Sequence, residues 1–279
     1  MNKTAVMLTS ILATSLAQPA AIAGPEEDRA AFVRYFQSRF PDVEFDEFAN
    51  GIYAIDADSR RQWLEIEEFP PYEFAIEQGE SEWQQTFANG RTFADCFAQP
   101  SDSIRAMYPR YEEARGEVVT LEIALNDCRA ANDEEPYAYD AEELIDLTAF
   151  LAFEARGKAV AVRIPADQPG AIAAYEDGKR FYYSKRGQLN FACSDCHITS
   201  VGQRVRADRL GPSLGHTTHF PVYRSKLGGM IGLQQRFLGC IRDVRAKPFE
   251  LQSTEYRNLE FFLAYMSNGL MINGPGARK

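Results

Sequence analysis

The chain has 279 residues, of which 45% are hydrophobic and 25% charged, a composition that is typical of globular proteins and excludes a largely disordered chain. Its formal net charge of −10 argues against nucleic acid or an anionic membrane as a partner. Residues 24–168 carry 13 basic and 32 acidic side chains, whereas residues 169–279 carry 16 basic and 8 acidic ones. We therefore expect two domains, and we expect the basic one to bind an anionic substrate or an acidic partner.

The first 23 residues have the pattern of a secretory signal peptide. Lys3 precedes an apolar run at 5–17, and small residues at 21–23 form a cleavage site. The run is too short to span a membrane and does not recur, so we expect no membrane span. A disordered or anchoring N-terminus is the alternative. We predict that residues 1–23 are removed on export to the periplasm, a compartment that permits disulfides.

The strongest chemical motif is C-S-D-C-H at 193–197. In an exported protein this C-x-x-C-H pattern is the attachment signature of a c-type haem. Cys193 and Cys196 would bond to the haem vinyl groups, and His197 would bind the iron from the proximal side. A thioredoxin-like pair would need a βαβ pattern, and a zinc site would need a second pair of ligands, and the sequence shows neither. We predict one covalently bound haem c.

Helical patterns lie on both sides of the haem motif. Apolar residues recur at near-helical spacing in 170–184 and 253–268, and Ser253 is a suitable N-cap. A helix, a haem motif, irregular loops and a terminal helix follow one another in class I cytochrome c domains. Such domains use a proline carbonyl to orient the proximal histidine, and we assign that role to Pro212.

Two local similarities relate the halves of the chain. FLAFEARG begins at Phe150 and FLAYMSNG at Phe262, and a cysteine lies 22 residues before each, at Cys128 and Cys240. Upstream, GRTFADC matches GQLNFAC, and the second of these ends at the first cysteine of the haem motif. Matching offsets in two places indicate an internal duplication.

The fold class that follows is mainly α, with two class I cytochrome c-like domains. We place the first at 24–165, including an N-terminal extension that contains the acidic stretch WLEIEEFPPYEFAIEQGESEW, and the second at 166–279. We expect only the C-terminal domain to carry haem.

The first copy lacks a haem motif. Cys96 is followed by FAQP, and the three histidines of the chain are His197, His216 and His219. With no haem between them, we expect Cys96 and Cys128 to form a disulfide, worth about 3.5–4 kcal/mol in a chain-entropy treatment. A redox-active pair is the alternative, although it would lack the C-x-x-C spacing.

Cys240 is then left without a partner. Arg236, Arg242, Arg245 and Lys247 surround it. Positive charge lowers the pKa of a thiol and favours the thiolate, which is both a nucleophile and a metal ligand. A buried, inert thiol is the alternative. If the segment is helical, Arg236 and Cys240 share one face because they are four residues apart.

The haem iron also needs a second axial ligand, commonly methionine or histidine. Met230 is a candidate, whereas Met266 lies in an apolar helical stripe typical of a core, and His216 and His219 lie in a segment typical of a loop. We choose Cys240, because its thiolate would lower the reduction potential and could itself be the reacting group.

The segments GQLNFACSDCH, LGPSLGHTTHFPVYRSK, RFLGCIRDVRAKPF, QSTEYRNLEFFLAYMSNG and INGPGARK resemble the SoxA family of cytochrome subunits from thiosulfate-oxidising bacteria. The resemblance covers nearly all of the chain after residue 23 and is most specific from Gly187 onward. It implies a single-haem member with Cys240 as distal ligand, often modified to a persulfide. It also implies that Arg236 contacts the substrate anion.

The activity that the resemblance implies is that of an L-cysteine S-thiosulfotransferase. Thiosulfate is coupled oxidatively to a cysteine of the carrier protein SoxYZ, and electrons leave through haem to the SoxX cytochrome subunit of a heterodimer and then to an acceptor c-type cytochrome. One alternative is an exported electron-transfer cytochrome without sulfur chemistry, which would not need Cys240 among arginines. Another is a haem enzyme for a different small oxyanion, which would need an open position on the iron.

Overall fold

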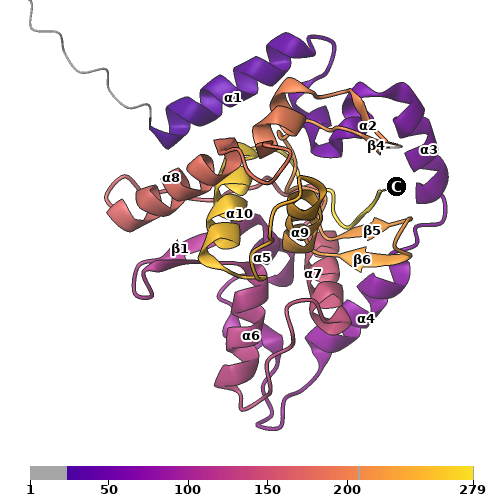
Figure 1. Cartoon of the computed structure of the whole chain (residues 1–279). Helices are drawn as coiled ribbons and strands as arrows, with labels where there is room; N and C mark the ends of the chain where they lie inside the picture. Colours follow the sequence, from indigo (N-terminus) through magenta and orange to yellow (C-terminus); the bar gives the residue numbers. More distant parts are fainter. Residues whose placement is uncertain (1–23, 207, 279) are drawn as a thin grey trace, which may run out of the picture.

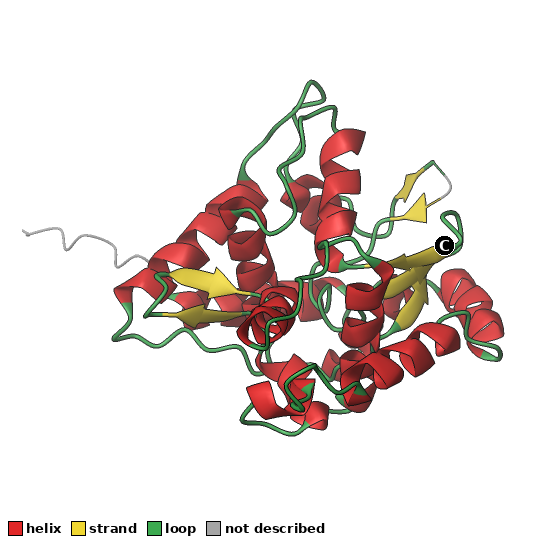
Figure 2. Ribbon diagram, turned by 90° about the horizontal axis from the view of Figure 1, so that it is seen from below, coloured by secondary structure: helices red, strands yellow, loops and turns green. Residues whose placement is uncertain are grey.

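The computed structural model describes residues 24–206 and 208–278, so the predicted signal peptide lies outside the described residues. The fold is mainly helical, as predicted, and Figure 2 shows short strands at the edges of the helical body. Within the described ranges, no helix combines the length and the apolar character needed to cross a membrane.

The helices are α1 (Pro25–Arg39), α2 (Ile52–Ile55), α3 (Ala57–Glu67), α4 (Glu73–Gln84), α5 (Ser101–Ile104), α6 (Leu121–Ala131), α7 (Glu142–Glu154), α8 (Pro169–Tyr183), α9 (Leu233–Asp243) and α10 (Thr254–Met266) (Figure 1). Short 3-10 turns are η1 (Phe45–Asn50), η2 (Phe93–Cys96) and η3 (Arg105–Met107), and η4 (Asp195–Thr199) is a π-helical turn.

The strands form three small sheets. Two are antiparallel pairs, made by β1 (Arg110–Glu112) with β2 (Glu117–Val119) and by β3 (Arg204–Val205) with β4 (Asp208–Arg209). The third has the order β6-β5-β7, in which β5 (Val222–Arg224) is antiparallel to β6 (Gly229–Ile231) and parallel to β7 (Gly276–Arg278).

In the first half of the chain, α4 crosses α7 at a glycine. A Cβ atom built on Gly79 would lie 2.9 Å from Cβ of Phe150 and closer still to the carbonyl oxygen of Asp146. A larger residue would push the two helices apart, because close-packed interiors have little room for an added methyl group. Glycine therefore sets the distance between α4 and α7.

In the second half, α8 and α10 cross in the same way. A Cβ on Gly178 would lie 2.9 Å from Cβ of Phe262 and closer to the carbonyl oxygen of Asn258. The rings of Tyr175 and Tyr182 pack against Phe262, with centroids 5.5 and 5.4 Å away. This helix pair builds the wall of the haem-motif half.

The apolar core divides into two clusters. One fills the first half around α4, α6 and α7 and contains Phe93, Leu125 and Leu147. The other fills the second half, and it also contains Phe32 and Phe36 from α1. The segment that begins the described chain therefore packs on the haem-motif half, and Figure 1 shows α1 to α3 beside the C-terminal elements, at the end away from α6.

The acidic stretch WLEIEEFPPYEFAIEQGESEW, predicted to belong to an N-terminal extension, contributes to two helices. Its first part ends α3, where Trp63 stacks on Tyr53 at 4.9 Å between ring centroids. Its second part is α4, which packs on α7 and is not an extension. Ala75 and Gly79 are buried on one face of α4, while Glu73, Glu77 and Glu80 are exposed, so the abundant acidic residues mask an amphipathic helix.

Other predicted elements are confirmed. The segment predicted at 170–184 is α8, and that predicted at 253–268 is α10. The hydroxyl of Ser253 accepts a hydrogen bond from the backbone nitrogen of Tyr256 at 3.4 Å, which is an N-cap contact.

Contacts join the two halves across β2 and α10. The guanidinium of Arg257 on α10 donates to a carboxylate oxygen of Glu117 on β2 at 2.7 Å. Arg105 is buried and donates to the carbonyl oxygen of Thr217 at 2.9 Å. Charged hydrogen bonds in protected positions favour one fixed arrangement of the halves.

Candidate functional site

The haem motif begins just before η4 and ends on it, and α1 holds the end of that turn. Asp195 accepts a hydrogen bond from the backbone nitrogen of Ala192 at 2.8 Å, which fixes its start. Arg39 on α1 donates to the carbonyl oxygens of Thr199 at 3.1 Å and of Val201 at 3.2 Å. The arginine satisfies carbonyls that the end of a helical turn leaves without backbone partners.

His197 is held as a neutral imidazole. Its Nδ1 lies 2.9 Å from the carbonyl oxygen of Gly211 and donates to it, which leaves the lone pair of Nε2 available. Burial, opposed by the Gly211 hydrogen bond and assisted by the charge of Arg236, lowers the pKa of His197 to about 4. A neutral imidazole oriented by its second nitrogen is a metal ligand.

The orienting carbonyl corrects one assignment from the sequence. The acceptor belongs to Gly211 and not to Pro212. The carbonyl of residue 211 forms the peptide bond to the proline nitrogen, so the ring of Pro212 constrains this peptide without supplying its oxygen. The next residue, Ser213, returns a backbone hydrogen bond to the carbonyl of His197 at 3.1 Å.

Three thiols meet beside this histidine. Cys193, Cys196 and Cys240 are partly buried and form no disulfide. Burial, followed by the proximity of Cys240, raises the pKa of the Cys193 thiol to about 12, and the same two causes raise the pKa of Cys196. Cys240 therefore lies close to both cysteines of the motif, although it comes from a different element.

The helix α9 brings Arg236 and Cys240 onto one face, as their spacing predicts. Arg236 is half-buried and lies beside Gly239, where a Cβ would be 3.3 Å from Nη1 of the guanidinium. The ion pairs of this region join Arg206 to Asp243 and Arg224 to Asp208, and Arg236 has none within 24–206 and 208–278. Its positive charge is available to an anion.

The remaining basic residues near Cys240 have a different position. Arg242, Arg245 and Lys247 are exposed at the end of α9 and after it. Exposed charges act weakly on a half-buried thiol because water and salt screen them. Of the four basic residues around Cys240 in the sequence, Arg236 is the one that faces the thiols.

The other candidate axial ligands lie elsewhere or have other contacts. Met266 is 1% exposed in the core of α10, as its apolar stripe predicts, and Met230 pairs with Tyr223 in the β6–β5 ladder. His219 stacks on Phe220 with 5.2 Å between ring centroids. His216 packs edge-on against the ring of His197 at 4.4 Å between centroids, so it supports the histidine of the motif.

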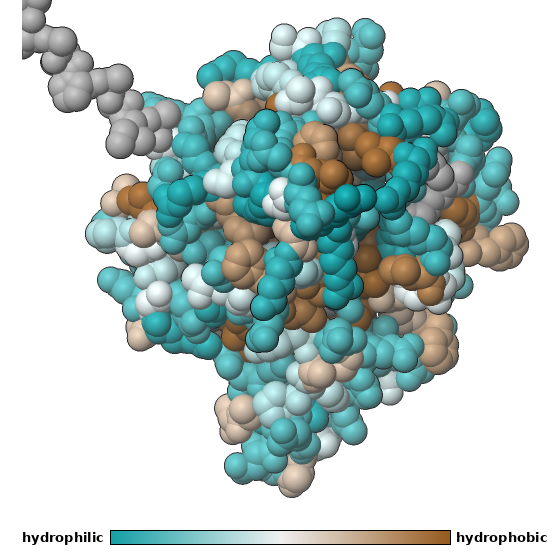
Figure 3. Space-filling model, in the orientation of Figure 1, coloured by the Kyte–Doolittle hydropathy of each residue, from teal (hydrophilic) through white to brown (hydrophobic). Residues whose placement is uncertain are grey.

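The donor set fits a c-type haem. Two thiols at C-x-x-C spacing, a neutral imidazole with Nε2 available and a third sulfur from α9 converge, and partly buried apolar side chains such as Ile198 and Leu238 accompany them. Figure 3 shows apolar atoms between hydrophilic ridges on the face where α9 and α10 lie in Figure 1. An apolar surround of this kind suits a porphyrin.

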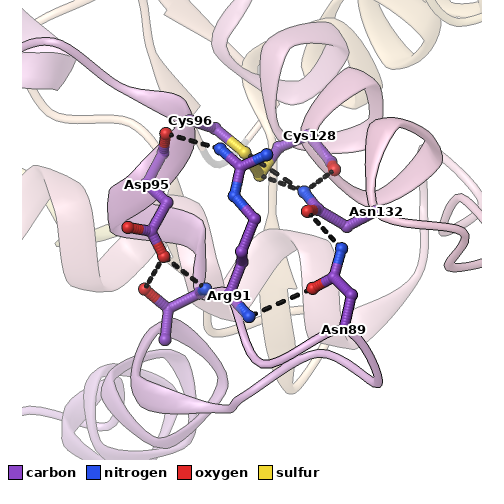
Figure 4. The surroundings of a disulfide bond; sticks show 7 residues. Asn89, Arg91, Asp95, Cys96, Cys128 and Asn132 are labelled. Carbon is purple, nitrogen blue, oxygen red and sulfur yellow. Dashed lines mark hydrogen bonds between the residues drawn. A yellow bond between two sulfur atoms is a disulfide. The ribbon is translucent and has the colours of Figure 1, made fainter.

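In the first half, Cys96 and Cys128 form a disulfide with 5.7 Å between their Cα atoms. Asn132 lies beside it, donating to the carbonyl oxygen of Cys128 at 2.7 Å, and Asn89 donates to the Oδ1 atom of Asn132 at 2.8 Å (Figure 4). The amide of Asn132 also approaches Sγ of Cys96 at 3.5 Å. Polar side chains therefore surround the bridge where the second half has its haem motif.

Three residues have roles in the site that their sequence patterns did not predict. Arg39 lies more than 150 residues before the turn that it caps, and His216 resembled a loop residue. Arg224, on β5, is 9% exposed and close enough to Arg236 for the two charges to repel. The one available indication was an arginine in the apolar strand pattern FPVYR before a glycine pair, a weak sign of a buried charge.

Comparisons with known proteins agree with this geometry. The family profile described as SoxA/TsdA, cytochrome c domain, matches residues 78–160. The chain is 56% identical to the L-cysteine S-thiosulfotransferase subunit SoxA of Allochromatium vinosum, over 94% of this chain and 92% of that protein. It is 49% identical to the subunit of the same name from Chlorobaculum tepidum, over 91% of this chain and 88% of that protein.

A solved structure is also similar. The crystal structure of SoxXA from P. pantotrophus contains a chain that is 30% identical, with a TM-score of 0.71, covering 81% of this chain and 86% of that one. Identity above 45% over nine-tenths of the chain, together with this likeness in structure, shows the relationship. The chain belongs to the SoxA family.

Proposed function

We propose that this protein is the thiosulfate-oxidising cytochrome c subunit of an L-cysteine S-thiosulfotransferase. It couples thiosulfate oxidatively to a cysteine of a SoxYZ carrier protein. One observation carries the assignment: the Cys240 thiol, which forms no disulfide, lies one helical turn after a half-buried Arg236 and beside the two thiols of the haem motif. A sulfur nucleophile and a cation for an anionic substrate thus share one site.

Cys193 and Cys196 would hold one haem covalently, with His197 and Cys240 as its axial ligands. When bound, haem supplies a one-electron acceptor that passes electrons to a partner cytochrome. A count of one is supported by the first half, which has no histidine and whose cysteines are joined to each other. The partly exposed thiol of Cys240 and the available Nε2 of His197 support the ligand pair.

The sulfur chemistry is assigned to Cys240. Its thiolate and the sulfane sulfur of thiosulfate form an S–S bond, and the two electrons released are taken up by the partner cytochrome; any thiol proton is lost to water. Arg236 holds the sulfonate end. The carrier's thiolate then attacks the sulfane sulfur, takes the S–SO₃⁻ group and releases the Cys240 thiolate, as in thiol–disulfide exchange. The carrier gains a thiosulfonate, and Cys240 returns to its starting state.

The partners and compartment follow the same assignment. A SoxX cytochrome in a heterodimer is supported by the likeness to a chain of SoxXA, and a soluble acceptor c-type cytochrome would take the electrons onward. Export to the periplasm, with residues 1–23 removed, is supported by the C-x-x-C-H motif and by the disulfide, which oxidising compartments permit.

We also propose that the two helix pairs mark two cytochrome c-like domains, 24–165 and 166–279, related by duplication. The support is a constant offset: Asp146 and Asn258 meet the crossing glycines with their carbonyls, and they are 112 residues apart, as are Cys128 and Cys240. The family profile, which matches 78–160, supports a cytochrome c-like first domain without a haem motif.

Substitution of Cys240 tests the assignment. Cys240→Ala should keep covalent haem, measured by its absorbance after denaturation, but should abolish the transfer of thiosulfate to SoxYZ, measured by the intact mass of the carrier. Arg242→Ala is the matched control, because Arg242 is on the same helix but exposed, and it should transfer at close to the wild-type rate. Transfer at a wild-type rate by Cys240→Ala would remove this thiol from the reaction.

The same assay separates the electron-transfer alternative. An electron carrier without sulfur chemistry would not reduce its acceptor cytochrome when thiosulfate and SoxYZ are added. We expect acceptor reduction that requires both, with two electrons appearing for each carrier modified. An acceptor that stays oxidised when both thiosulfate and the carrier are present would instead favour simple electron transfer.

A further inference from the structure

Arg224 is a buried arginine for which the established contacts give no role. It lies on β5 and is 9% exposed, and its Nη2 atom is enclosed without a hydrogen-bond partner among the described residues. Burying a guanidinium without an acceptor is costly, and nearly all buried polar groups in proteins have a partner. An anion that arrives from outside the chain would supply one.

The side chain of Arg224 lies in the site of Arg236 and Cys240. Burial is the largest cause that lowers the pKa of Arg224, and the charge of Arg236 is the next. The Cys240 thiol has a smaller effect and raises this pKa. The charge of Arg236 also lowers the pKa of His197 and that of Cys196, so Arg236 lies near both. Two guanidinium groups without bonded acceptors thus converge beside the reactive thiol.

The backbone fixes the distance between the two arginines. β5 is the central strand of its sheet, with Arg224 opposite Gly229 of β6 and Arg278 of β7. Glycine at 229 leaves the space beside Arg224 open, since nothing lies within 4 Å of a Cβ built there. The hairpin continues through Gly232 directly into α9, so the strand and the helix carry the two arginines as one rigid unit.

The nearest carboxylate only partly balances this charge. Oδ2 of Asp208 lies 3.7 Å from Nη2 of Arg224, beyond hydrogen-bond distance, and 3.6 Å from Nζ of Lys226. Asp208 is partly exposed and shared between two cations, and its attraction is therefore weakened by solvent. Lys226 is more than half exposed, which makes it a useful control.

We propose that Arg224 is a second substrate-binding residue, which together with Arg236 holds the sulfonate oxygens of thiosulfate while the sulfane sulfur faces Cys240. This inference rests on the proposed function and extends its substrate site. Two planar forks from different elements can bind all three oxygens of a sulfonate, which would orient the S–S axis; a single fork would leave it free to rotate. The geometry selects for small oxyanions that carry a terminal sulfur.

Equilibrium binding tests the proposal without turnover. In the haem-loaded Cys240→Ala protein, thiosulfate affinity is measured by calorimetry, and then again with Arg224→Gln or Arg224→Lys added. Loss of a charge-assisted hydrogen-bond pair should weaken binding roughly 10- to 100-fold for glutamine, and lysine should restore part of it. Lys226→Gln, on the same hairpin, should change affinity by less than about twofold. Haem absorbance and reduction potential should match those of the Cys240→Ala parent in all of these variants.

Contrary results have separate meanings. Unchanged affinity in Arg224→Gln would overturn the proposal. A displaced reduction potential with unchanged affinity would assign Arg224 to a haem carboxylate, an oxyanion of similar geometry, and would overturn it as well. Failure of the Cys240→Ala protein to bind thiosulfate at all would also count against it. If instead the wild-type protein never transferred thiosulfate to the carrier, the proposed function itself would fail.

Discussion

The two helix pairs of this molecule share a backbone design but use their cysteines differently. In each, a glycine on the first helix lies against a carbonyl of the second, Gly79 against Asp146 and Gly178 against Asn258. In the first half, Cys96 bonds to Cys128; in the second, Cys193 and Cys240 occupy the matching places in the sequence and form no disulfide.

The two halves differ in how the cysteines at matching sequence positions are used. In the first half, the cysteine that matches the first haem-linking position reaches the cysteine that matches Cys240, with Cα atoms 5.7 Å apart. The same two positions in the second half are near enough for one thiol to raise the pKa of the other. A covalent bridge thus joins the two sulfurs of one half, while the sulfurs at the matching places of the other half form no disulfide, as the proposed function requires.

The largest effect should come from removing the bridge. Changing Cys96 and Cys128 to alanine should lower the free energy of unfolding of the first half by about 3.5–4 kcal/mol, because the unbridged unfolded chain gains loop entropy over 32 residues. Denaturation followed by far-ultraviolet circular dichroism measures the loss, and haem absorbance reports on the second half.

Reductant gives the control for this prediction. Wild-type protein unfolded in reductant should match the double variant, because thioether links to haem are not reduced, whereas Cys240→Ala should respond to reductant as the wild type does. A denaturation midpoint that is the same with and without reductant would show that the disulfide contributes nothing to stability.

The fold and site were predictable to the extent that they depend on local patterns. Apolar spacing located α8 and α10, and the C-x-x-C-H motif with the isolated Cys240 correctly predicted the three cysteines that form no disulfide. Helix α4 was not predicted. It shares with α8 only the pattern A-x-E-x-G, which begins at Ala75 in α4 and at Ala174 in α8. This pattern is too short to be recognised beside the many glutamates of α4.

Contacts between distant segments were not predictable. Arg224 reaches the site because a hairpin reverses the chain between β5 and α9, and the apolar pattern FPVYR, which Arg224 ends, is only a weak sign of its burial. The orienting carbonyl was misplaced by one residue, since the direction of a peptide group next to Pro212 depends on the path of the whole loop. Such features arise from tertiary packing, which a linear pattern does not contain.

A smaller effect should follow from filling the helix crossings. Gly79→Ala and Gly178→Ala should each lower the free energy of unfolding by about 2–3 kcal/mol, because the added methyl would overlap a carbonyl and displace a helix. The two should differ in haem content: Gly178→Ala should reduce covalent haem per chain, and Gly79→Ala should leave it unchanged. Denaturant midpoints and haem absorbance measure both.

Gly229→Ala is the control for these substitutions, as nothing lies within 4 Å of a Cβ at that position. It should unfold at close to the wild-type midpoint. If Gly79→Ala lowered haem content as much as Gly178→Ala, the two crossings would belong to one cooperative unit. The two helix pairs would then not mark two separate domains.

The smallest effect should be a pH dependence of the free energy of unfolding, which Asp146 causes at one crossing and Asn258 does not cause at the other. Burial, and then the charges of Glu142, Glu143 and Glu82, raise the pKa of Asp146 to about 7. Because the folded-state pKa lies above the ordinary value, the stability that protonated Asp146 contributes is complete below about pH 4 and is lost as the pH rises through 7. Asn258 in the other half has no such titration.

Exchanging the two residues isolates this contribution. Asp146→Asn should raise the free energy of unfolding by about 1–2 kcal/mol at pH 8, after allowance for solvent screening, and by little at pH 4. Asn258→Asp should do the opposite and should add a pH dependence to the haem-motif half. The difference from wild type is the measured quantity, since Glu260, whose pKa burial raises to about 8, titrates in all three proteins. Equal gains at pH 4 and pH 8 for Asp146→Asn would mean that packing, and not the buried charge, distinguishes the two crossings.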